Sequence, residues 1–397
     1  MIQFDALIIG GGPSGATAAL LLAKAGWSVA IVEKKTFPRR KVCGEFISAT
    51  SLPLLQKLGI AQLYLTKGGP EVRRVGLFAS DSMLISKMPP LNHSVHRWGR
   101  ALGREHLDTV LLAAAESAGA TLWQPCQVKN LKRNSSMFTG LIVSKDGTIN
   151  ISARIVISAQ GSWEPETSPL SKPNHRRSDM LAFKAHFKNS ELTQDLMPLL
   201  AFPGGYGGLV HTDNGRVTLS CCIRRDTLQK VRERYRGMQA GEAVFQHIMT
   251  TCLGVRKTLT NAKREGAWLA VGPIRPGIRQ CYADGVFYAG NIAGEAHPVV
   301  AEGISMAMQS AWLLSDVLIN RQKDILTNTG IDEAGAAYTK QWKRQFISRI
   351  YAAKLFAQFA MRPWITAMVL PIIKIFPGLL SVGAKMSGKI QQVILKN

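Results

Sequence analysis

Near its N-terminus the chain reads ALIIGGGPSGATAALLLAKAGWSVAIVE over residues 6–33. The apolar run at 6–9 is typical of a strand that is covered on both faces in a parallel sheet. Residues 16–26 then favour a helix that ends at Gly26, and residues 28–34 favour a second strand. This order of strand, turn, helix and strand predicts an α/β fold built on a parallel sheet.

The turn between the first strand and the helix carries glycines at the spacing G-x-G-x-x-G, at Gly10, Gly12 and Gly15. Gly10 permits a tight turn, Gly12 lets backbone N–H groups approach a pyrophosphate, and Gly15 lets the helix pack closely on the strand. The helix N-terminus itself favours an anion. Glu33 ends the second strand and is placed to accept hydrogen bonds from ribose hydroxyls. The motif therefore predicts a dinucleotide site, which also includes Pro13, Ser14 and Lys34.

Three later segments carry a resemblance to a known family. Residues 37–45, FPRRKVCGE, resemble a segment of FAD-dependent oxidoreductases of the geranylgeranyl reductase and flavin halogenase type. Residues 102–108, LGREHLD, are similar to the R-x-x-L-D segment that these flavoproteins share with aromatic hydroxylases. Residues 285–298, GVFYAGNIAGEAHP, followed by EGIS at 302–305, resemble their second FAD motif. The resemblance spans residues 5 to about 318 and implies a non-covalently bound FAD.

The same resemblance implies which residues hold the FAD. Beyond the glycine motif they are Arg40, Lys41, Arg104, Val128, Gly290, Asn291, Pro298, Gly303 and Ile304. The family usually has an Asp, bonded to the ribityl chain of the flavin, where this chain has Asn291. An amide still forms a hydrogen bond to a hydroxyl, and hydroxylases of the ubiquinone-pathway type share this asparagine.

The electron donor is less well defined by the resemblance. Gln160 stands where the family's G-A-D-G segment has an Asp, which aromatic hydroxylases use to position NAD(P)H. The chain also has no second G-x-G-x-x-G that would indicate a separate nicotinamide domain. The donor therefore stays open between NAD(P)H and another reductant.

The expected architecture is a Rossmann-like FAD-binding domain of the para-hydroxybenzoate-hydroxylase type, with an inserted β-sheet substrate domain and a C-terminal helical tail. Alternating apolar residues predict half-buried strands at 180–187 and 216–223. The FAD-binding domain is predicted at 1–70, 101–170 and 275–335, the substrate domain at 71–100 and 171–274, and the tail at 336–397.

Three side chains are candidates for chemistry. His297 suits acid–base or positioning work, and the alternative is a loop histidine that contacts backbone or flavin. Cys43 lies in a segment that approaches the flavin in the reductases, and the alternative is a small apolar filler. Tyr206 lies in FPGGYGGL at 202–209, which resembles the reductases' P-G-G-Y-G-W segment, and the alternative is a core tyrosine. Gly208 replaces that segment's aromatic residue, which widens the expected pocket.

The predicted activity is that of an FAD-dependent monooxygenase acting on an aromatic or polyketide-like apolar small molecule, as in secondary metabolism. The G-N…H-P pattern at 290–298 favours it. Reduction of isoprenoid double bonds is the alternative, favoured by C-G-E at 43–45 and disfavoured by Gly208. Modification of another polypeptide is a further alternative. Halogenation has little support, because the W-x-W-x-I-P motif of tryptophan halogenases is absent. The substrate itself and the oligomeric state are not predicted.

The formal net charge of +23 indicates anionic partners. Nucleic acid is not expected, because no nucleic-acid-binding module is recognised. Residues 340–397 hold ten Lys and Arg and no Asp or Glu, with apolar residues at helical spacing. They predict a cationic amphipathic helix. Such a helix either contacts an anionic membrane surface or packs on the body with a solvated basic face.

The six cysteines form no C-x-x-C pair and no Cys/His array, so neither a metal site nor a disulfide framework is expected. We interpret them as reduced thiols of a cytoplasmic protein, with any peripheral membrane contact on the inner face. The N-terminus lacks the features of a signal peptide. A spanning helix at 363–384 has poor support, because Pro371, Lys374 and Pro377 interrupt it.

Overall fold

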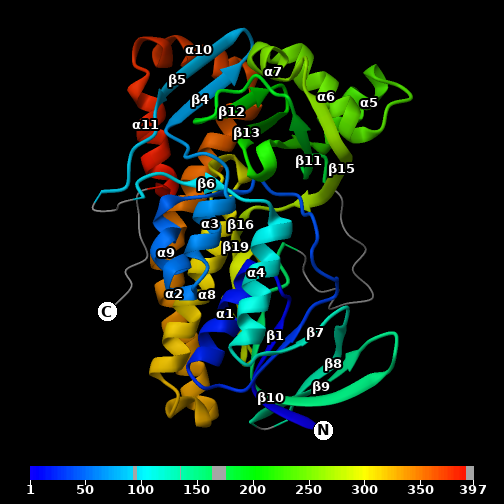
Figure 1. The fold of residues 1–397 in the computed structure, drawn as a ribbon, viewed down its shortest axis with the longest axis vertical. Coiled ribbons are helices and arrows are strands. Elements are labelled where there is room, and N and C mark those ends of the chain that lie inside the picture. The colour runs from blue at the N-terminus through cyan, green and yellow to red at the C-terminus, as the bar shows by residue number, and fades with distance from the viewer. Residues whose placement is uncertain (93–95, 135, 163–175, 390–397) are drawn as a thin grey trace.

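The computed structural model describes residues 1–92, 96–134, 136–162 and 176–389, and two sheets organise them (Figure 1). The first sheet has the strand order β17-β18-β10-β1-β2-β7, and β8 and β9 extend it from β10. The second has the order β15-β11-β14-β13-β12-β4-β5. The expected α/β architecture, with a Rossmann-like domain, a second sheet and C-terminal helices, is confirmed.

The first sheet contains the N-terminal motif. Its strands are β1 (Ile2–Ile9), β2 (Val29–Val32), β7 (Thr121–Trp123), β8 (Gln127–Asn134), β9 (Met137–Val143), β10 (Thr148–Ser158), β17 (Tyr282–Ala283) and β18 (Val286–Tyr288). The strands from β18 to β7 run parallel. Ala6 and Ile8 of β1 pack in the core shared with the helices, whereas Phe4 and Leu7 pack toward β8 and β9. The predicted strand is therefore buried on both faces.

Three helices form a layer against this sheet: α1 (Pro13–Lys24), α4 (Arg104–Ser117) and α8 (Gly303–Asn320). The predicted helix at 16–26 is confirmed as α1, and the predicted strand at 28–34 as β2. The helix ends at Lys24, before Gly26, which adopts a left-handed φ of 86° and turns the chain into β2.

The second sheet is built from two stretches of chain. Its strands are β4 (Arg74–Ala79), β5 (Ser82–Lys87), β11 (Met180–Lys188), β12 (Leu196–Phe202), β13 (Gly205–His211), β14 (Val217–Arg224) and β15 (Lys263–Ile274). One face packs on α5 (Arg225–Arg234), α6 (Ala240–Thr251) and α7 (Leu253–Leu259). The strands expected at 180–187 and 216–223 are present as β11 and β14, but the expectation that they are half-buried is wrong: helices α5–α7 cover one face and the other faces a second apolar cluster, so both faces are buried. The domain boundaries given above stay a prediction, and the one at 170 lies outside the described residues.

Short elements connect the two sheets. The strand pairs are β3 (Phe46–Ile47) with β6 (Arg100–Ala101), and β16 (Gly277–Ile278) with β19 (Gly294–Glu295). Two short helices, α2 (Leu52–Leu58) and α3 (Ala61–Lys67), pack beside α1 and α8. These connections bring the C-G-E segment at 43–45 and the second motif, which begins near residue 290, to the space between the sheets.

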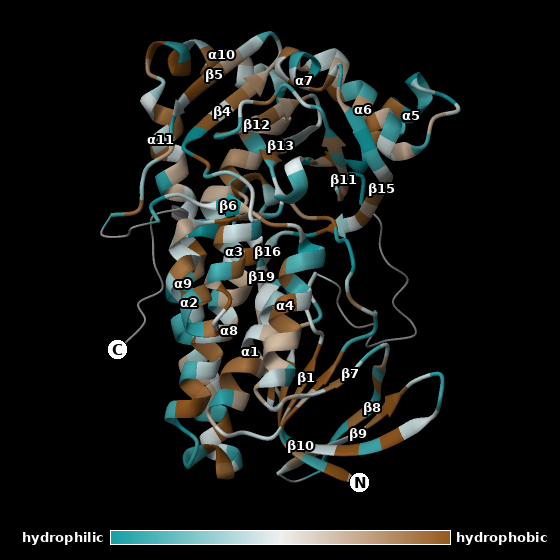
Figure 2. Cartoon of the chain, viewed as in Figure 1, coloured by the Kyte–Doolittle hydropathy of each residue, from teal (hydrophilic) through white to brown (hydrophobic). Residues whose placement is uncertain are grey.

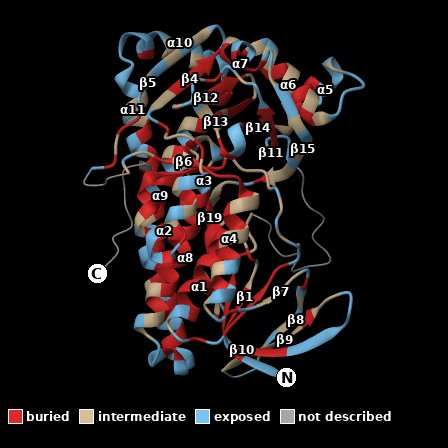
Figure 3. Ribbon diagram, in the orientation of Figure 1, coloured by how far each residue is buried: buried red, intermediate tan, exposed pale blue. Residues whose placement is uncertain are grey.

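The C-terminal helices are α9 (Asn328–Met361), α10 (Pro363–Ile375) and α11 (Gly378–Ala384). Helix α9 begins eight residues before the predicted tail. It packs first on the core of the first sheet through Trp342 and Phe346, then on the second sheet through Ala357 and Ala360. It therefore packs on the body, whereas α10 and α11 carry brown apolar residues in Figure 2 that are largely exposed in Figure 3.

The length and composition of the described helices bear on whether the chain could span a membrane. No single helix among the described residues has the length and the apolar composition that crossing a bilayer requires. Helices α9 and α10 have the required length and apolar composition only when they are taken together, and the chain bends by 102° between them. Residues 390–397 of the predicted tail lie outside the described residues.

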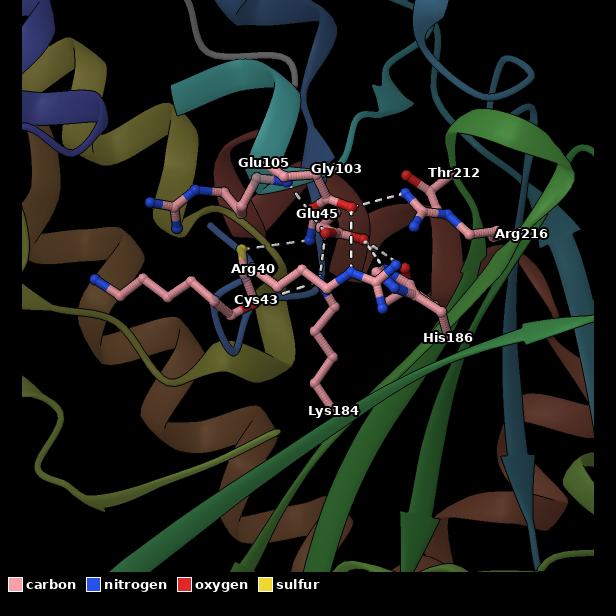
Figure 4. A network of polar contacts seen from close by, with 12 residues as sticks. Arg40, Cys43, Glu45, Gly103, Glu105, Lys184, His186, Thr212 and Arg216 are labelled. Carbon is pink, nitrogen blue, oxygen red and sulfur yellow. Dashed lines mark hydrogen bonds and ion pairs between the residues drawn. The ribbon is translucent and has the colours of Figure 1, made fainter. Parts of the chain in front are cut away.

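The buried carboxylate of Glu45 joins the first domain to the second sheet (Figure 4). Its Oε2 lies 2.9 Å from His186 Nε2 and accepts a hydrogen bond of 2.6 Å from Thr218 Oγ1. Its Oε1 contacts Lys184 Nζ and accepts a bond of 3.2 Å from the backbone N–H of Arg104. Burial by itself would raise the pKa of this carboxyl, but His186 and Lys184 hold it well below its usual range.

A second polar cluster lies beside it. Arg216 ion-pairs with Asp213 and, at 2.9 Å, with Glu105. Asp213 also accepts a bond of 2.6 Å from the N–H of Gly103 and lies 3.2 Å from His106 Nε2. Glu105, His106 and Asp213 have the geometry of a possible cation site. Arg216 already supplies the positive charge there, so we assign no metal to it.

The Glu45 junction leads to a stability prediction. Glu45→Gln leaves Lys184 and His186 buried beside a neutral amide, so the free energy of unfolding should fall by about 3–5 kcal/mol. Thr218→Val removes one hydrogen bond to the ionised carboxylate and should cost less, about 1.5–3 kcal/mol. Denaturant unfolding of both variants measures the two values.

The pH dependence provides a further check. Because the folded pKa of Glu45 is depressed, its contribution is complete above the ordinary carboxyl pKa and is lost as the pH falls toward the folded value. The difference between wild type and Glu45→Gln should therefore shrink in acid. A difference below about 1 kcal/mol at neutral pH would contradict the role assigned to Glu45.

Candidate functional site

A cavity of about 520 Å³ lies between the two sheets and the C-terminal helices. Most of the sequence-predicted site residues line it. They are Gly12, Pro13, Ser14, Lys41, Cys43, Arg104, Tyr206, Asn291, His297, Pro298, Gly303 and Ile304. The structure thus brings the glycine loop, the C-G-E segment, the second FAD motif and the candidate catalytic residues to one space.

The three motif glycines are needed for different reasons. A Cβ on Gly10 would lie 2.6 Å from Ala159 O, and one on Gly15 would lie 1.8 Å from Gly10 O. The packing of the chain on itself therefore requires glycine at both positions. A Cβ on Gly12 would meet only Arg104 Nη2, at 3.9 Å. Protein packing leaves room at Gly12, and a ligand that approaches the backbone explains the glycine there.

The N-terminus of α1 faces the free space beside Gly12 and has the properties of an anion site. Gly12 is the N-cap and supplies no side-chain cap, which leaves the first N–H groups of the helix available. Ser14 Oγ is buried and has no hydrogen-bond partner among the described residues. These features fit the pyrophosphate of an FAD.

Two cations extend the anion site. Asp108 fixes Arg104 through two hydrogen bonds of 2.6 Å, to Nε and Nη2. Lys41 lies nearby, and burial together with the charges of Arg104 and Arg39 lowers its pKa to about 8. A bound diphosphate would offset this crowding of positive charge.

Glu33 lies where the motif predicts the acid. It is buried, its Oε2 accepts a 2.8 Å hydrogen bond from the N–H of Gly11, and its Oε1 accepts one of 2.9 Å from the N–H of Lys35. Oε1 also ion-pairs with Arg39 Nη2 at 3.7 Å, and Oε2 keeps a second lone pair with which to accept a hydrogen bond from a ribose hydroxyl. Glu33 thereby also holds the glycine loop against the end of β2.

Some predicted cofactor residues do not line the cavity. Lys34 is exposed beyond the end of β2. Arg40 ion-pairs with Glu105 at 3.6 Å and with Glu265 at 3.1 Å. Val128 packs on the far side of the first sheet, in strand β8. Their contacts with the cofactor stay predictions.

The second motif touches the first. Gly290 adopts a φ of 77°, and a Cβ there would lie 2.9 Å from that of Ser14. The Asn291 amide donates to Ser162 Oγ at 3.1 Å and to Glu295 Oε1 at 3.0 Å. The side chain of Asn291 is therefore held at the cavity wall, and its bond to a flavin hydroxyl stays a prediction.

Tyr206 and His297 form a pair at the cavity. The phenol oxygen of Tyr206, in β13, lies 3.1 Å from Nδ1 of His297. Burial and the positive charge of Lys354 lower the pKa of His297 to about 4. Burial raises the pKa of Tyr206 well above its ordinary value. Both side chains are therefore neutral near pH 7.

The third candidate, Cys43, lies two residues before Glu45 and lines the same cavity. Its Sγ accepts a hydrogen bond of 3.3 Å from the N–H of Glu45, and its side chain is partly buried against the core of the first domain. It shares the cavity wall with Lys41 and Arg104. This contact with Glu45 suits a residue that shapes the loop.

Sequence reasoning missed two acids here. Glu45 and Glu295 both stand in quoted motifs, but neither was assigned a role. Lys184 and His186 occupy alternate positions of a buried strand, so they share one face and require a buried acid. That signal points to Glu45. Glu295 is buried at the cavity wall, where Ser162 Oγ donates to its Oε1 at 2.9 Å and burial raises its pKa.

Several known proteins are similar to this chain in sequence. A menaquinone reductase of Mycolicibacterium smegmatis is 21% identical over 97% of this chain and 91% of its own length. A digeranylgeranylglycerophospholipid reductase of Methanopyrus kandleri is 23% identical over 90% of each. Conditioned medium factor receptor 1 of Dictyostelium discoideum is 26% identical over 80% of this chain, which spans only 63% of the receptor.

Solved structures share the fold. The flavin-dependent brominase Bmp2 superposes with a TM-score of 0.76 over 98% of this chain and 94% of the brominase, at 18% identity. PqsL of Pseudomonas aeruginosa, in complex with 2-aminobenzoylacetate, gives a TM-score of 0.69 over 93% of this chain and all of PqsL, at 17% identity.

The family model described as an FAD binding domain matches residues 3–337, most of the chain. That range contains the glycine loop, Arg104, the second motif and the Tyr206–His297 pair. The cofactor inferred from the cavity is therefore FAD, and the chain belongs to the FAD binding domain family of FAD-dependent oxidoreductases.

Proposed function

We propose that the chain is an FAD-dependent monooxygenase that hydroxylates an aromatic or polyketide-like molecule with an apolar portion. The observation that carries the proposal is the neutral Tyr206–His297 pair at the wall of a largely apolar cavity. FAD, when bound, supplies the redox chemistry and the activation of oxygen. The protein has to hold the cofactor, orient the substrate and exclude water.

The pair holds protons in place rather than releasing them. A tyrosine with a raised pKa is a weak acid, and a histidine with a pKa of about 4 carries no spare proton at pH 7. Nδ1 of His297 faces Tyr206, which leaves Nε2 for the substrate. This nitrogen donates or accepts, depending on the tautomer. The pair therefore suits a substrate hydroxyl, such as that of a phenol, which has to be held and polarised.

The remaining wall suits an apolar substrate. The second sheet contributes Leu77, Leu199 and Leu209, and the C-terminal helices contribute Phe356 and Ile373. Burying an alkyl chain there stabilises the complex by about 0.8 kcal/mol per methylene. We infer a substrate whose polar end lies at the Tyr206–His297 pair and whose apolar end lies toward α10.

Gly208 keeps this space open. It lies in β13 at the cavity wall, and a Cβ there would meet only Pro198 O, at 3.4 Å. The aromatic residue that the reductases carry in this segment would occupy part of the cavity. A wider pocket admits a ring more readily than a pocket narrowed by that aromatic.

Reduction of an isoprenoid double bond is the second candidate. The menaquinone reductase and the digeranylgeranylglycerophospholipid reductase, which match most of this chain, favour it. Glu295 is a specific observation in its support. Its raised pKa would let a protonated carboxyl at the cavity wall supply the proton that double-bond reduction needs.

Oxygen dependence separates the two reactions. The FAD-loaded, reduced chain is mixed with 4-alkylphenols under ¹⁸O₂, and in parallel with menaquinone under strict anaerobiosis. We expect one ¹⁸O atom in the phenolic product. Tyr206→Phe removes the hydrogen bond that positions His297, so kcat should fall by roughly tenfold, or about 1.4 kcal/mol, with unchanged FAD content. Anaerobic saturation of menaquinone, with no oxygen incorporation into any phenol, would reject the monooxygenase in favour of the reductase.

The two glycine positions give a matched test of the cofactor site. Gly12→Val should fold normally but fail to retain FAD, because its side chain occupies space that only the ligand uses. Gly15→Val should fail to fold, because its side chain would overlap the backbone of Gly10. Flavin absorbance and the thermal unfolding midpoint measure both effects. Normal FAD retention by Gly12→Val would contradict the assigned position of the pyrophosphate.

Lys41 predicts how FAD affinity depends on pH. An anion binds the protonated lysine more tightly, so affinity should be highest below pH 8 and fall as Lys41 loses its proton above it. A decrease of about tenfold between pH 7 and pH 9 corresponds to about 1.4 kcal/mol. Fluorescence titration of FAD measures it. Lys41→Gln should bind more weakly with a flat profile, and an equal slope in that variant would remove Lys41 as the cause.

A further inference from the structure

Helix α10 presents an apolar face to the outside of the molecule. Trp364, Met368, Ile372 and Ile375 recur at helical spacing, and their exposed fractions are 63%, 66%, 51% and 71%. Residues at such spacing lie along one side of a helix. Large apolar side chains exposed to this degree on contiguous turns are unusual on a surface that has no partner.

The exposed apolar face continues beyond α10. Eleven of the eighteen large apolar side chains that are exposed among the described residues lie between 351 and 386. We use the term docking face for Trp364, Met368, Ile372, Ile375, Phe376, Leu379, Val382 and Met386. Strand β5, at the edge of the second sheet, packs against α11, and its Leu84 lies with Leu370 and Leu380 in one apolar cluster. Figures 2 and 3 show that apolar composition and exposure coincide over α10 and α11.

The charged residues of the C-terminal segment that carries the docking face have one sign. Arg362, Lys374 and Lys385 are exposed within or beside it, and residues 340–397 contain no Asp or Glu. Apolar side chains flanked by cations match the boundary of an anionic bilayer, where each basic residue near the surface adds attraction. A second copy of the chain fits less well, because two surfaces of the same positive charge would repel each other.

The inner side of the same helices forms the cavity wall. Thr366, Val369 and Ile373 of α10, and Leu380 of α11, line the cavity. Thus one layer of helix separates the substrate space from the docking face. An apolar molecule dissolved in a bilayer would have only this layer to pass.

We propose that α10 and α11 dock on an anionic membrane surface, so that an apolar substrate enters the cavity from the bilayer. The docking itself is independent of the reaction, whereas the entry route rests on the proposed function. The apolar side chains would lie at the depth of the headgroups and first methylenes, as those of interfacial helices do. The basic residues would remain at the level of the lipid phosphates.

Vesicle flotation of the full FAD-loaded chain tests the docking. The vesicles are phosphatidylcholine alone, or phosphatidylcholine with phosphatidylglycerol. We expect flotation with the anionic vesicles, weakened by added salt. The triple variant Trp364→Ser, Met368→Ser and Ile372→Ser should partition at least about tenfold less. The matched control Met238→Ser with Leu326→Ser changes exposed apolar residues elsewhere and should float as wild type does. FAD content and the unfolding midpoint verify that each variant is folded.

Three results would overturn the docking proposal. The first is that the wild type does not float, and the second is that wild type and triple variant float equally. The third is a concentration-dependent dimer that only the triple variant fails to form, because this result would assign the docking face to a second copy of the chain. Flotation is read without turnover, whereas the oxygen experiment uses substrate in solution. A failure of one therefore leaves the other interpretable.

Discussion

The buried carboxylate of Glu45 is the interaction on which the rest of the site depends. It satisfies Lys184, His186 and Thr218 of the second sheet and accepts the N–H of Arg104 from the first domain. A buried ion cluster tolerates little displacement, because each unpaired charge would cost several kcal/mol. The segment that contains Lys41 and Cys43 is thereby fixed at the cavity, and the two sheets keep the separation that the cofactor requires.

Positively charged side chains lie at both ends of the cavity. At one end, Arg104 and Lys41 lie beside the N-terminus of α1, where the FAD pyrophosphate is expected. At the other end, Arg362 and Lys374 lie beside the exposed apolar side chains of α10. Between them, the neutral Tyr206–His297 pair provides the polar point in a largely apolar wall. In the proposed reaction the cations hold the FAD pyrophosphate, the Tyr206–His297 pair holds the polar end of the substrate, and the apolar wall holds its apolar end.

The local parts of this arrangement could be predicted from the sequence, and the long-range parts could not. The glycine loop, Glu33 and Arg104 stand in motifs whose spacing itself carries the geometry. Arg40 stands in such a motif too, but its partner Glu265 is 225 residues away in the chain, which no local pattern reveals. The sequence of the tail predicts an amphipathic helix, which either contacts an anionic membrane surface or packs on the body. Hydrophobic spacing shows that a face is apolar, but it does not show what covers that face.

The most direct measurement is a crystal structure of the FAD-loaded chain with a long-chain 4-alkylphenol bound. We predict that the phenol hydroxyl lies within hydrogen-bond distance of the Tyr206–His297 pair. We also expect the FAD pyrophosphate at the N-terminus of α1, and the alkyl chain against Val369 and Ile373 on the inner side of α10. A phenol hydroxyl bound away from this pair, or an alkyl chain directed away from α10, would contradict this prediction.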